Sequence, residues 1–366
     1  MIKLKILLII IIVSIFLIKL YKKYCKVASQ FLNINNLIYN YNLKNNKIHL
    51  LDKSNIMNNL DYRVKWCMGI WYDTKFKIDP NDNDLIKIPN KILIDYNKNK
   101  YTKSKFYINY FLPIFKIFKN NNYVYIESGD VTQCHEKPYI TKSRPIDCNS
   151  NIIILLNAHR HWGNVKDIKK IDINFDNKKS VSIWRGTTTG SNNRKGNRFD
   201  LIDKWYGKNK MIDVGFSFIC RNDEKDNMDI YLNKKNKYSN KVTGNMKIED
   251  LLKYKYLISV EGNDVASGLK WMLYSNSLVL MPKPTVVSWF MEDHLVPYYH
   301  YIPIKDDWSD LYDQYKWCEK NQDKCKEIIK NANDYVKRFL DEFEYGFAYK
   351  IHKTIADKYY KNIYIE

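Results

Sequence analysis

Short apolar runs alternate with polar stretches along most of the chain, and the alternation is clearest between residues 176 and 335. Four apolar runs in this region predict buried strands, and a pattern with helical spacing lies between the last two. The predicted strands are Ser180–Trp184, Met211–Phe218, Tyr256–Val260 and Ser277–Met281, and the predicted helix is Ala266–Tyr274. Strands that alternate with helices are typical of a parallel sheet that binds ligands at the carboxyl ends of its strands.

The region before residue 176 has a weaker pattern of the same kind. Three runs predict further strands at Lys91–Tyr96, Tyr123–Glu127 and Asn151–Leu156. From Trp308 onward, the apolar period and the charge pattern predict helices. We therefore expect two α/β domains that face a cleft, residues 61–175 and 176–335, followed by a helical tail at residues 336–366.

The N-terminus contains a 13-residue apolar run, Ile6–Ile18, between Lys5 and Lys19. This is shorter than the roughly 20 residues of a typical spanning helix and also suits a signal-peptide core. However, the flanking lysines can snorkel and no A-x-A cleavage site follows. We expect residues 1–26 to form an uncleaved single-pass membrane anchor, and residues 27–60 a stalk. Because lysines lie on both sides of the run, the orientation stays open between a lumenal and a cytoplasmic catalytic part.

Composition narrows the class of protein. The 366 residues are 45% hydrophobic, which excludes wholesale disorder. The formal charge of +20 fits the abundant lysine of an AT-rich genome, and it also fits attraction to nucleotide phosphates or an acidic membrane surface. No basic block is interleaved with aromatic residues, so nucleic acid is not an expected partner. The seven cysteines resemble no disulfide scaffold, and their odd number leaves at least one thiol unpaired within the chain.

Two polar segments that follow predicted strands are candidates for phosphate binding. The segment EGNDVASG follows Tyr256–Val260; its small residues let a ligand approach the backbone, and the start of the next helix offers N–H groups. The segment RGTTTGSNNRKGNR, which begins at Arg185, combines a small, hydroxyl-rich turn with arginines suited to phosphate. It is not a Walker A loop, because it lacks GK[ST]. Each segment also fits a plain structural connection.

Candidate acids and histidines lie in the first of the two regions. Asp130 follows the predicted strand Tyr123–Glu127, where a carboxylate can act as a general base or stabilise a turn. Asp82 and Asp84 have the D-x-D spacing of metal-dependent sugar transferases, which is also that of an ordinary polar turn. His159 and His161 have no third ligand at a suitable spacing, so we expect them to pack rather than bind metal.

Between Tyr123 and Leu340, the motifs together resemble glycosyltransferase family 90. This family includes protein O-glucosyltransferases, fungal capsule xylosyltransferases and bacterial lipopolysaccharide sugar transferases. The resemblance rests on GDVTQ, YITKSRPID, NAHRHWG and IWRGTTTG in this order, and on the run from Lys255 to Leu311. Within that run, EGNDVASGLKW is most similar to the bacterial and viral-type branch.

The resemblance implies a GT-B fold of two Rossmann-like domains, here preceded by the transmembrane anchor. It also implies inverting, metal-independent transfer of glucose or xylose from a UDP-sugar to a hydroxyl of a glycan, glycolipid or protein, with no separate cofactor. Asp130 matches the general base of the family. The positions that match its donor-binding loops are Arg185, Gly186, Thr187, Arg198, Glu261, Gly262, Asn263, Asp264, Val265, Ala266, Ser267 and Lys270.

One position departs from the family pattern. Many members have an arginine just before the L-K pair of the second donor loop, and this chain has Gly268. If that arginine neutralises the diphosphate elsewhere, then Arg185, Arg198 or Lys270 must do so here. Two alternatives remain open: a sugar-binding or scaffold protein without turnover, and a metal-dependent transferase that uses Asp82 and Asp84.

Overall fold

The computed structural model describes residues 57–87, 117–118, 122–127, 129–131, 133–155, 161–190, 194–220 and 228–365. The predicted anchor, most of the predicted stalk and the predicted strand Lys91–Tyr96 lie outside these residues. Within the described ranges, no helix has both the length and the apolar character that a membrane crossing requires.

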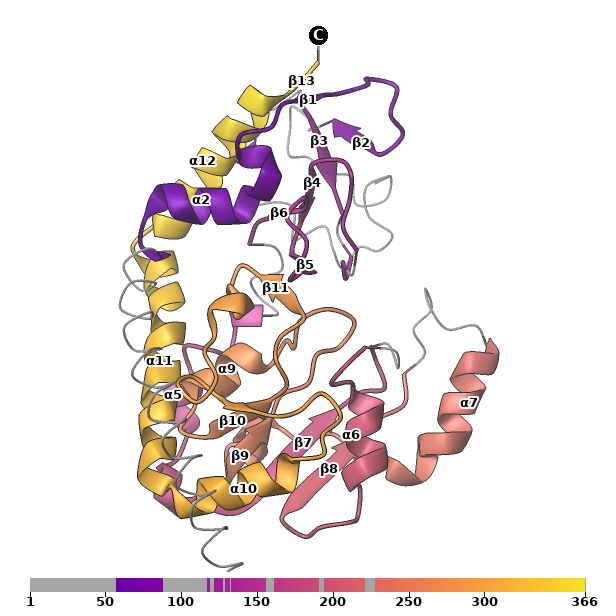
Figure 1. The fold of residues 1–366 in the computed structure, drawn as a ribbon, viewed down its shortest axis with the longest axis vertical. Helices are drawn as coiled ribbons and strands as arrows, with labels where there is room; N and C mark the ends of the chain where they lie inside the picture. The colour runs from indigo at the N-terminus through magenta and orange to yellow at the C-terminus, as the bar shows by residue number, and fades with distance from the viewer. Residues whose placement is uncertain are drawn as a thin grey trace, which may run out of the picture. The chain divides into compact units, whose positions relative to one another are not determined.

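A parallel five-stranded sheet contains all four predicted strands of residues 176–335 (Figure 1). Its order is β12-β10-β9-β7-β8, and each neighbouring pair is parallel. The strands are β7 (Lys179–Gly186), β8 (Ile212–Phe216), β9 (Tyr254–Ile258), β10 (Leu278–Met281) and β12 (Ile302–Pro303). The predicted strands and their parallel arrangement are therefore confirmed.

Apolar side chains cover both faces of this sheet. Tyr256 and Ile258 of β9 belong to one buried cluster, whereas Leu257 between them packs with Ile183 and Leu251 in another. Successive side chains of a strand point to opposite faces, so a strand covered on both sides has to be apolar at consecutive positions. This explains why these strands appear in the sequence as continuous apolar runs.

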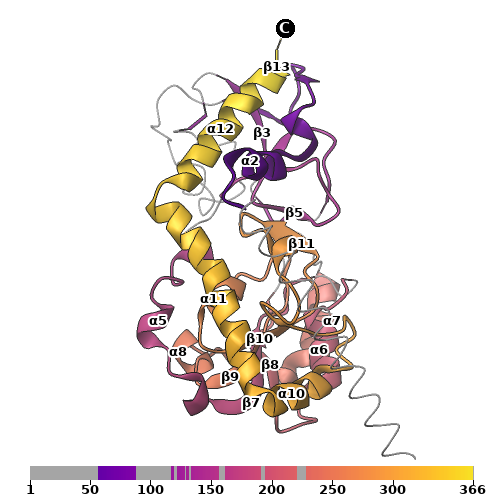
Figure 2. The same ribbon diagram turned by 60° about the vertical axis from the view of Figure 1, so that its left-hand side comes forward.

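Helices precede, separate and follow these strands in the sequence. They are α5 (Ile168–Ile171), α6 (Arg198–Trp205), α7 (Met228–Tyr238), α8 (Ile248–Leu251), α9 (Leu269–Tyr274), α10 (Leu311–Lys320) and α11 (Gln322–Glu344). Helix α6 contacts β8, and α11 contacts β10 (Figure 2). Helix α11 also contacts α9. The predicted helix Ala266–Tyr274 corresponds to α9, which begins three residues later because Gly268 takes the N-cap position. Helix α11 continues without a break across residue 336, where the predicted tail begins.

A smaller sheet contains the strand that leads to Asp130. Its order is β2-β3-β4-β6; β2 is antiparallel to β3, and the other pairs are parallel. The strands are β2 (Leu85–Lys87), β3 (Tyr123–Ile126), β4 (Tyr139–Thr141) and β6 (Ile152–Ile153). The predicted strands at residues 123–127 and 151–156 correspond to β3 and β6, and β6 is shorter than predicted.

Short pairings join segments that are distant in the sequence. Strand β5 (Ser143–Pro145) is antiparallel to β11 (Val286–Ser288), and β1 (Phe76–Lys77) is parallel to β13 (Ile363–Tyr364). The helix α12 (Phe347–Asn362) contacts α2 (Leu60–Met68), so the end of the chain packs beside residues near its described beginning. Short 3-10 turns complete the described elements at Gly69–Tyr72, Phe175–Asn177, Ser239–Lys241 and Glu292–His294.

A buried ion pair links α2 to α11. Arg63 is fully buried and pairs with Glu342, which is 4% exposed. The Arg63 guanidinium also lies 5.1 Å from the ring centroid of Trp289 and 5.3 Å from that of Phe339. Burial raises the pKa of Glu342, and the charge of Arg63 opposes this rise. Each charge of the pair therefore depends on the other to offset its loss of hydration.

Candidate active site

Asp130 lies beyond the carboxyl end of β3, and its side chain is 26% exposed. One carboxylate oxygen, Oδ1, is paired with the ammonium group of Lys142. The other, Oδ2, accepts a hydrogen bond from Asn263 Nδ2 at 3.0 Å. The structure thus brings the predicted base into direct contact with the predicted donor loop at residues 261–267.

Lys142, which the sequence motifs did not single out as functional, links two aspartates. Its ammonium group contacts Asp130 and lies 3.1 Å from Oδ2 of Asp264, and Ser143 Oγ donates to that same oxygen at 2.9 Å. The Lys142 side chain is only 5% exposed. Burial by itself lowers the pKa of Lys142, but Asp264 and Asp130 outweigh burial, and the net shift is upward. Lys142 is therefore a buried, charged ammonium group at neutral pH.

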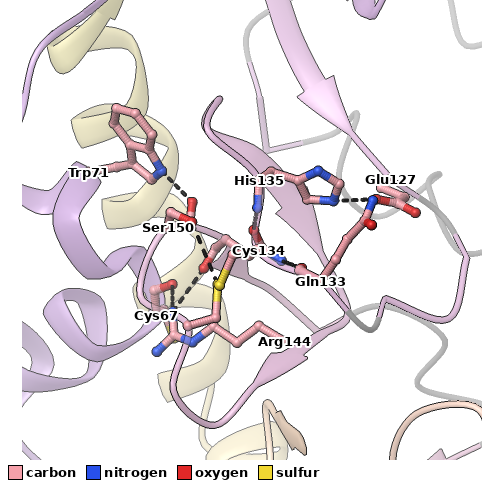
Figure 3. The surroundings of a disulfide bond; sticks show 10 residues. Cys67, Trp71, Glu127, Gln133, Cys134, His135, Arg144 and Ser150 are labelled. Atoms are coloured by element: carbon pink, nitrogen blue, oxygen red, sulfur yellow. Dashed lines mark hydrogen bonds and ion pairs between the residues drawn. A yellow bond between two sulfur atoms is a disulfide. The ribbon is translucent and has the colours of Figure 1, made fainter.

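The segment after Asp130 is held by several bonds (Figure 3). The Glu127 carboxylate contacts the imidazole ring of His135 across the loop. The Asn151 side chain accepts from the backbone N–H of His135 and donates to the carbonyl of Gln133, both at 2.9 Å. A disulfide between Cys134 and Cys148, with Cα atoms 5.6 Å apart, ties the same segment to the residues before β6. This disulfide has no signal in the sequence, since only the fold shows which cysteines are neighbours.

The two predicted donor loops meet because β7 and β9 are adjacent in the sheet. One loop follows the carboxyl end of β7 and the other follows that of β9. Arg198 bridges them: its Nη1 donates to the carbonyl of Thr187 at 3.0 Å and to Thr189 Oγ1 at 2.6 Å, and its Nε donates to the carbonyl of Glu261 at 3.1 Å. Arg198 therefore lies between the two loops and donates hydrogen bonds to both.

Glycine is required where the loops approach each other most closely. Gly190 has a φ of +96°, and a Cβ atom at this position would lie 2.9 Å from the carbonyl oxygen of Gly262. A Cβ atom on Gly262 would lie 2.8 Å from Nη2 of Arg198. Asn263 Oδ1 accepts from the backbone N–H of Gly190 at 2.9 Å, which adds a bond between the loops. The positive φ and the backbone contact require glycine at position 190, whereas a side chain at position 262 would displace the Arg198 guanidinium.

Arg194 holds the second loop through its backbone. Its guanidinium donates to the carbonyls of Gly262, Asn263 and Asp264 at 2.9, 3.0 and 3.1 Å. It also lies 3.6 Å from the carboxylate of Glu261. Arg194 thus contacts four consecutive residues of this loop, although the motifs that resemble the family did not select it. Its position in a basic loop between two glycines was the available signal.

The Glu261 carboxylate binds the backbone of a neighbouring segment. It accepts from the backbone N–H groups of Thr285 and Val286 at 2.9 and 3.2 Å, and from Thr285 Oγ1. Burial raises the pKa of Glu261, while these hydrogen bonds and Arg194 oppose the rise. Glu261 therefore anchors the loop to the segment that leads into β11.

The structure places two other predicted cations apart from Arg198. Arg185 donates to Asp213 Oδ1 at 2.7 Å, and to the Asp213 carbonyl on β8 at 3.1 Å. Lys270 is buried, with its ammonium group 3.5 Å from Glu292 and 5.1 Å from the ring centroid of Phe290. Each of them thus has an acidic partner outside the two donor loops.

The remaining predicted donor residues surround these contacts. Gly186 ends β7, Thr187 and Thr189 share a hydroxyl hydrogen bond at 3.0 Å, and Ser267 lies just before the N-cap of α9. Val265 and Ala266 are buried and line a hollow, which Glu261 and two lysines also border. The two lysines are Lys195 and Lys283. Positive side chains therefore border the second loop on the side of this hollow.

The two aspartates of the metal hypothesis bind a lysine. The ammonium group of Lys137 lies 2.7 Å from Asp82 and 3.0 Å from Asp84, and Tyr125 donates its hydroxyl to Asp82 at 3.0 Å. The Lys137 hydrogen bond is the main reason that the pKa of Asp82 is lowered. Within the described parts of the chain, no group of three His, Cys, Asp or Glu side chains is arranged to hold a metal ion. His161 lies near Lys142 and Lys270 at a small cavity, and His159 is outside the described residues.

Comparison with protein families gives one match that covers more than half of the chain. The model described as "Glycosyl transferase family 90" matches residues 156–361. These residues include β7 to β12, both predicted donor loops and most of α12. Asp130 and Lys142 lie before the matched region.

Curated proteins from a bacterium, a virus and an animal are similar to parts of the chain. The O-glucosyltransferase LpsA of Dichelobacter nodosus is 33% identical over 213 residues, which are 58% of this chain and 59% of that protein. The uncharacterized protein 179R of Invertebrate iridescent virus 6 is 35% identical over 25% of this chain and 8% of that protein. Protein O-glucosyltransferase 3 of Homo sapiens is 31% identical over 30% of this chain and 22% of that protein. The chain thus matches less than two thirds of the length of each of these relatives.

Among solved structures, the N-terminal domain of the Candida albicans trehalose-6-phosphate phosphatase is similar to part of this chain. The alignment covers 55% of this chain and 45% of that domain's chain. The TM-score is 0.27 and the identity 13%, so this likeness carries no argument about the fold.

Proposed function

We propose that this chain, which belongs to glycosyl transferase family 90, transfers a sugar from a UDP-sugar to a hydroxyl of a glycan, a glycolipid or a protein. The observation that carries the proposal is the contact between Asp130 and Asn263, because it joins a candidate base to a candidate donor loop. The names of the relatives, O-glucosyltransferase LpsA and protein O-glucosyltransferase 3, favour glucose as the sugar.

The proposed architecture is GT-B. Two features support it: there are two sheets with parallel strands, and each carries one part of the site at the carboxyl edge. Asp130 follows β3 of the smaller sheet, whereas the donor loops follow β7 and β9 of the larger one. Ligands of α/β proteins bind outside the carboxyl ends of their strands.

The proposed reaction is a single in-line displacement with inversion. The acceptor hydroxyl oxygen forms a bond to the anomeric carbon while the bond from that carbon to the phosphate oxygen breaks. The leaving UDP takes the electron pair of the broken bond, and Asp130 receives the hydroxyl proton as general base. Charge develops on the diphosphate, so we assign its stabilisation to Arg198 and to the N–H groups of the two loops. We propose that no metal ion takes part.

This function is tested by incubating the purified full chain with a panel of nucleotide-sugars and detecting the released nucleotide by mass spectrometry. UDP is expected from UDP-glucose or UDP-xylose, at a rate that EDTA does not change. Binding of a UDP-sugar without any release, with and without added acceptors, would favour the sugar-binding alternative. Loss of release in EDTA would favour the metal-dependent alternative with Asp82 and Asp84.

The assignment of the donor loops predicts a loss of UDP affinity in Arg198→Ala. A hydrogen bond to a charged group contributes about 1.5–3 kcal/mol, so the dissociation constant for UDP should rise about 10- to 150-fold by calorimetry. Gly268→Arg in the Arg198→Ala background should recover part of the loss. Gly268 has ordinary helical backbone angles, and a Cβ atom there would need only small movements of the Trp271 and Met272 side chains, at 3.0 and 3.1 Å.

Arg185→Ala is the matched control for this experiment. Arg185 is also an arginine next to the first loop, but its guanidinium is bonded to Asp213. We expect a smaller change in UDP affinity than in Arg198→Ala. Equal UDP binding by Arg198→Ala and the wild type would mean that the phosphates bind elsewhere.

A further inference from the structure

We infer that Lys142 is a positioning residue for the proposed reaction, which holds the Asp130 carboxylate against the donor loop and keeps it ionised. This inference rests on the proposed function and deepens it. Lys142 is buried, and its ammonium group contacts an oxygen of Asp130 and an oxygen of Asp264. A single cation thus joins the candidate base to the loop that follows β9.

Five side chains form the connection. The Lys142 ammonium group and the Ser143 hydroxyl both donate to the carboxylate of Asp264. Asn263, the neighbour of Asp264, donates from the other side to Asp130. The Lys142 ammonium group and the Asn263 amide therefore hold Asp130 from two different segments of the chain. A shift of the donor loop would change the Asn263–Asp130 contact and the Lys142–Asp264 contact at once.

The arrangement also leaves Asp130 able to act as a base. The Asp130 side chain is 26% exposed, and Lys142 and Asn263 each contact a different one of its carboxylate oxygens. The exposed part of Asp130 can therefore accept a proton from an acceptor hydroxyl while both bonds persist. We assign no proton transfer to Lys142, because its ammonium group contacts the carboxylates of Asp130 and Asp264.

The charges around Lys142 determine the expected pH dependence. Asp130 and Asp264 are the acidic groups that contact it. Lys270 and His161 line the small cavity beside it, and Lys270 has its own acidic partner, Glu292. Removing the Lys142 charge should raise the pKa of Asp130, because an ammonium neighbour is lost and the Asp264 charge is no longer offset.

The test is the pH profile of kcat/KM for release of UDP from UDP-glucose by the full chain. In Lys142→Met, the acidic limb of the profile should move upward by about 1–2 pH units. Lys142→Arg keeps the charge, so its limb should stay near that of the wild type. Asp264→Asn leaves Lys142 with Asp130 alone, so its limb should move downward. If Lys142 had only a structural role, its substitution would lower the amount of active enzyme. The acidic limb would then not move upward in Lys142→Met and downward in Asp264→Asn.

Lys137→Met is the matched control. Lys137 also bridges two aspartates, at 2.7 and 3.0 Å, but neither belongs to the proposed site. The acidic limb of the pH profile of Lys137→Met should coincide with that of the wild type. The inference is overturned if Lys142→Met folds and the acidic limb of its profile does not move. If Lys142→Met does not fold, an unmoved acidic limb in Asp264→Asn overturns it. Undiminished turnover in Asp130→Asn is a different result: it would overturn the proposed function itself.

Discussion

Asp130→Asn is expected to lower turnover about 10²–10⁴-fold while the dissociation constant for UDP changes little. The substitution keeps the shape of the side chain but removes the group that accepts the hydroxyl proton. In the proposed site UDP binds at the two loops, which Arg194 and Arg198 hold through backbone carbonyls that the substitution leaves in place. The measurement pairs steady-state release of UDP with calorimetric binding of UDP.

The amide introduced by Asp130→Asn has one acceptor oxygen in place of two. It can keep the bond from Lys142 or the one from Asn263, but not both. A small rise in the UDP dissociation constant is therefore compatible with the prediction. A large rise together with unchanged turnover at saturating donor would assign Asp130 to donor binding.

Asp82→Asn is the matched control for this variant. Asp82 is also an aspartate that holds a lysine, with Lys137 at 2.7 Å. The Asp82→Asn variant should retain turnover close to that of the wild type if Asp130 is the base and no metal is needed. Turnover that is lost in Asp82→Asn and kept in Asp130→Asn would reverse the assignment in favour of the metal-dependent alternative.

The second large effect concerns stability. Arg63→Leu is expected to lower the free energy of unfolding by about 3–5 kcal/mol, because Glu342 would remain buried without its partner. The double variant Arg63→Leu with Glu342→Leu removes both charges and should recover most of the loss. Urea unfolding of the wild type and the two variants, followed by circular dichroism, measures the difference.

The deficit of Arg63→Leu should depend on pH. Burial already raises the pKa of Glu342, and loss of Arg63 raises it further. A carboxyl group with a raised pKa in the folded state binds its proton more readily when folded, so low pH favours folding relative to neutral pH. The deficit should therefore be largest near neutral pH and shrink as the pH falls through the raised pKa of Glu342.

Glu344→Ala provides the comparison at the surface. The Lys166–Glu344 pair is 3.9 Å apart, and its side chains are 57% and 59% exposed. Its loss should change stability by less than about 1 kcal/mol, as for most exposed ion pairs. A deficit of Arg63→Leu as small as this would mean that water reaches the Arg63–Glu342 pair.

The strands of the larger sheet could be predicted from the sequence because their signal is local. Leu257 and its neighbours are apolar at consecutive positions, which is what burial on both faces requires. The order of motifs likewise sufficed to indicate the family, which the match over residues 156–361 confirms. Local pattern also located the two loops and Asp130 at the ends of strands.

Only the tertiary structure decided which of these residues meet. Ser143 and Asp264 are 121 positions apart, and Arg63 and Glu342 are 279 apart, so no local period relates them. Arg185 and Arg198 look equivalent in the sequence. In the fold, β7 pairs with β8, which places Arg185 beside Asp213. Strands β7 and β9 are also adjacent, so that Arg198 lies between the two loops that follow them. Cys134 and Cys148, which are 14 positions apart, also become neighbours only in the fold. Contacts of this kind depend on strand order and register, and these are set by the packing of the whole chain rather than by the residues on either side.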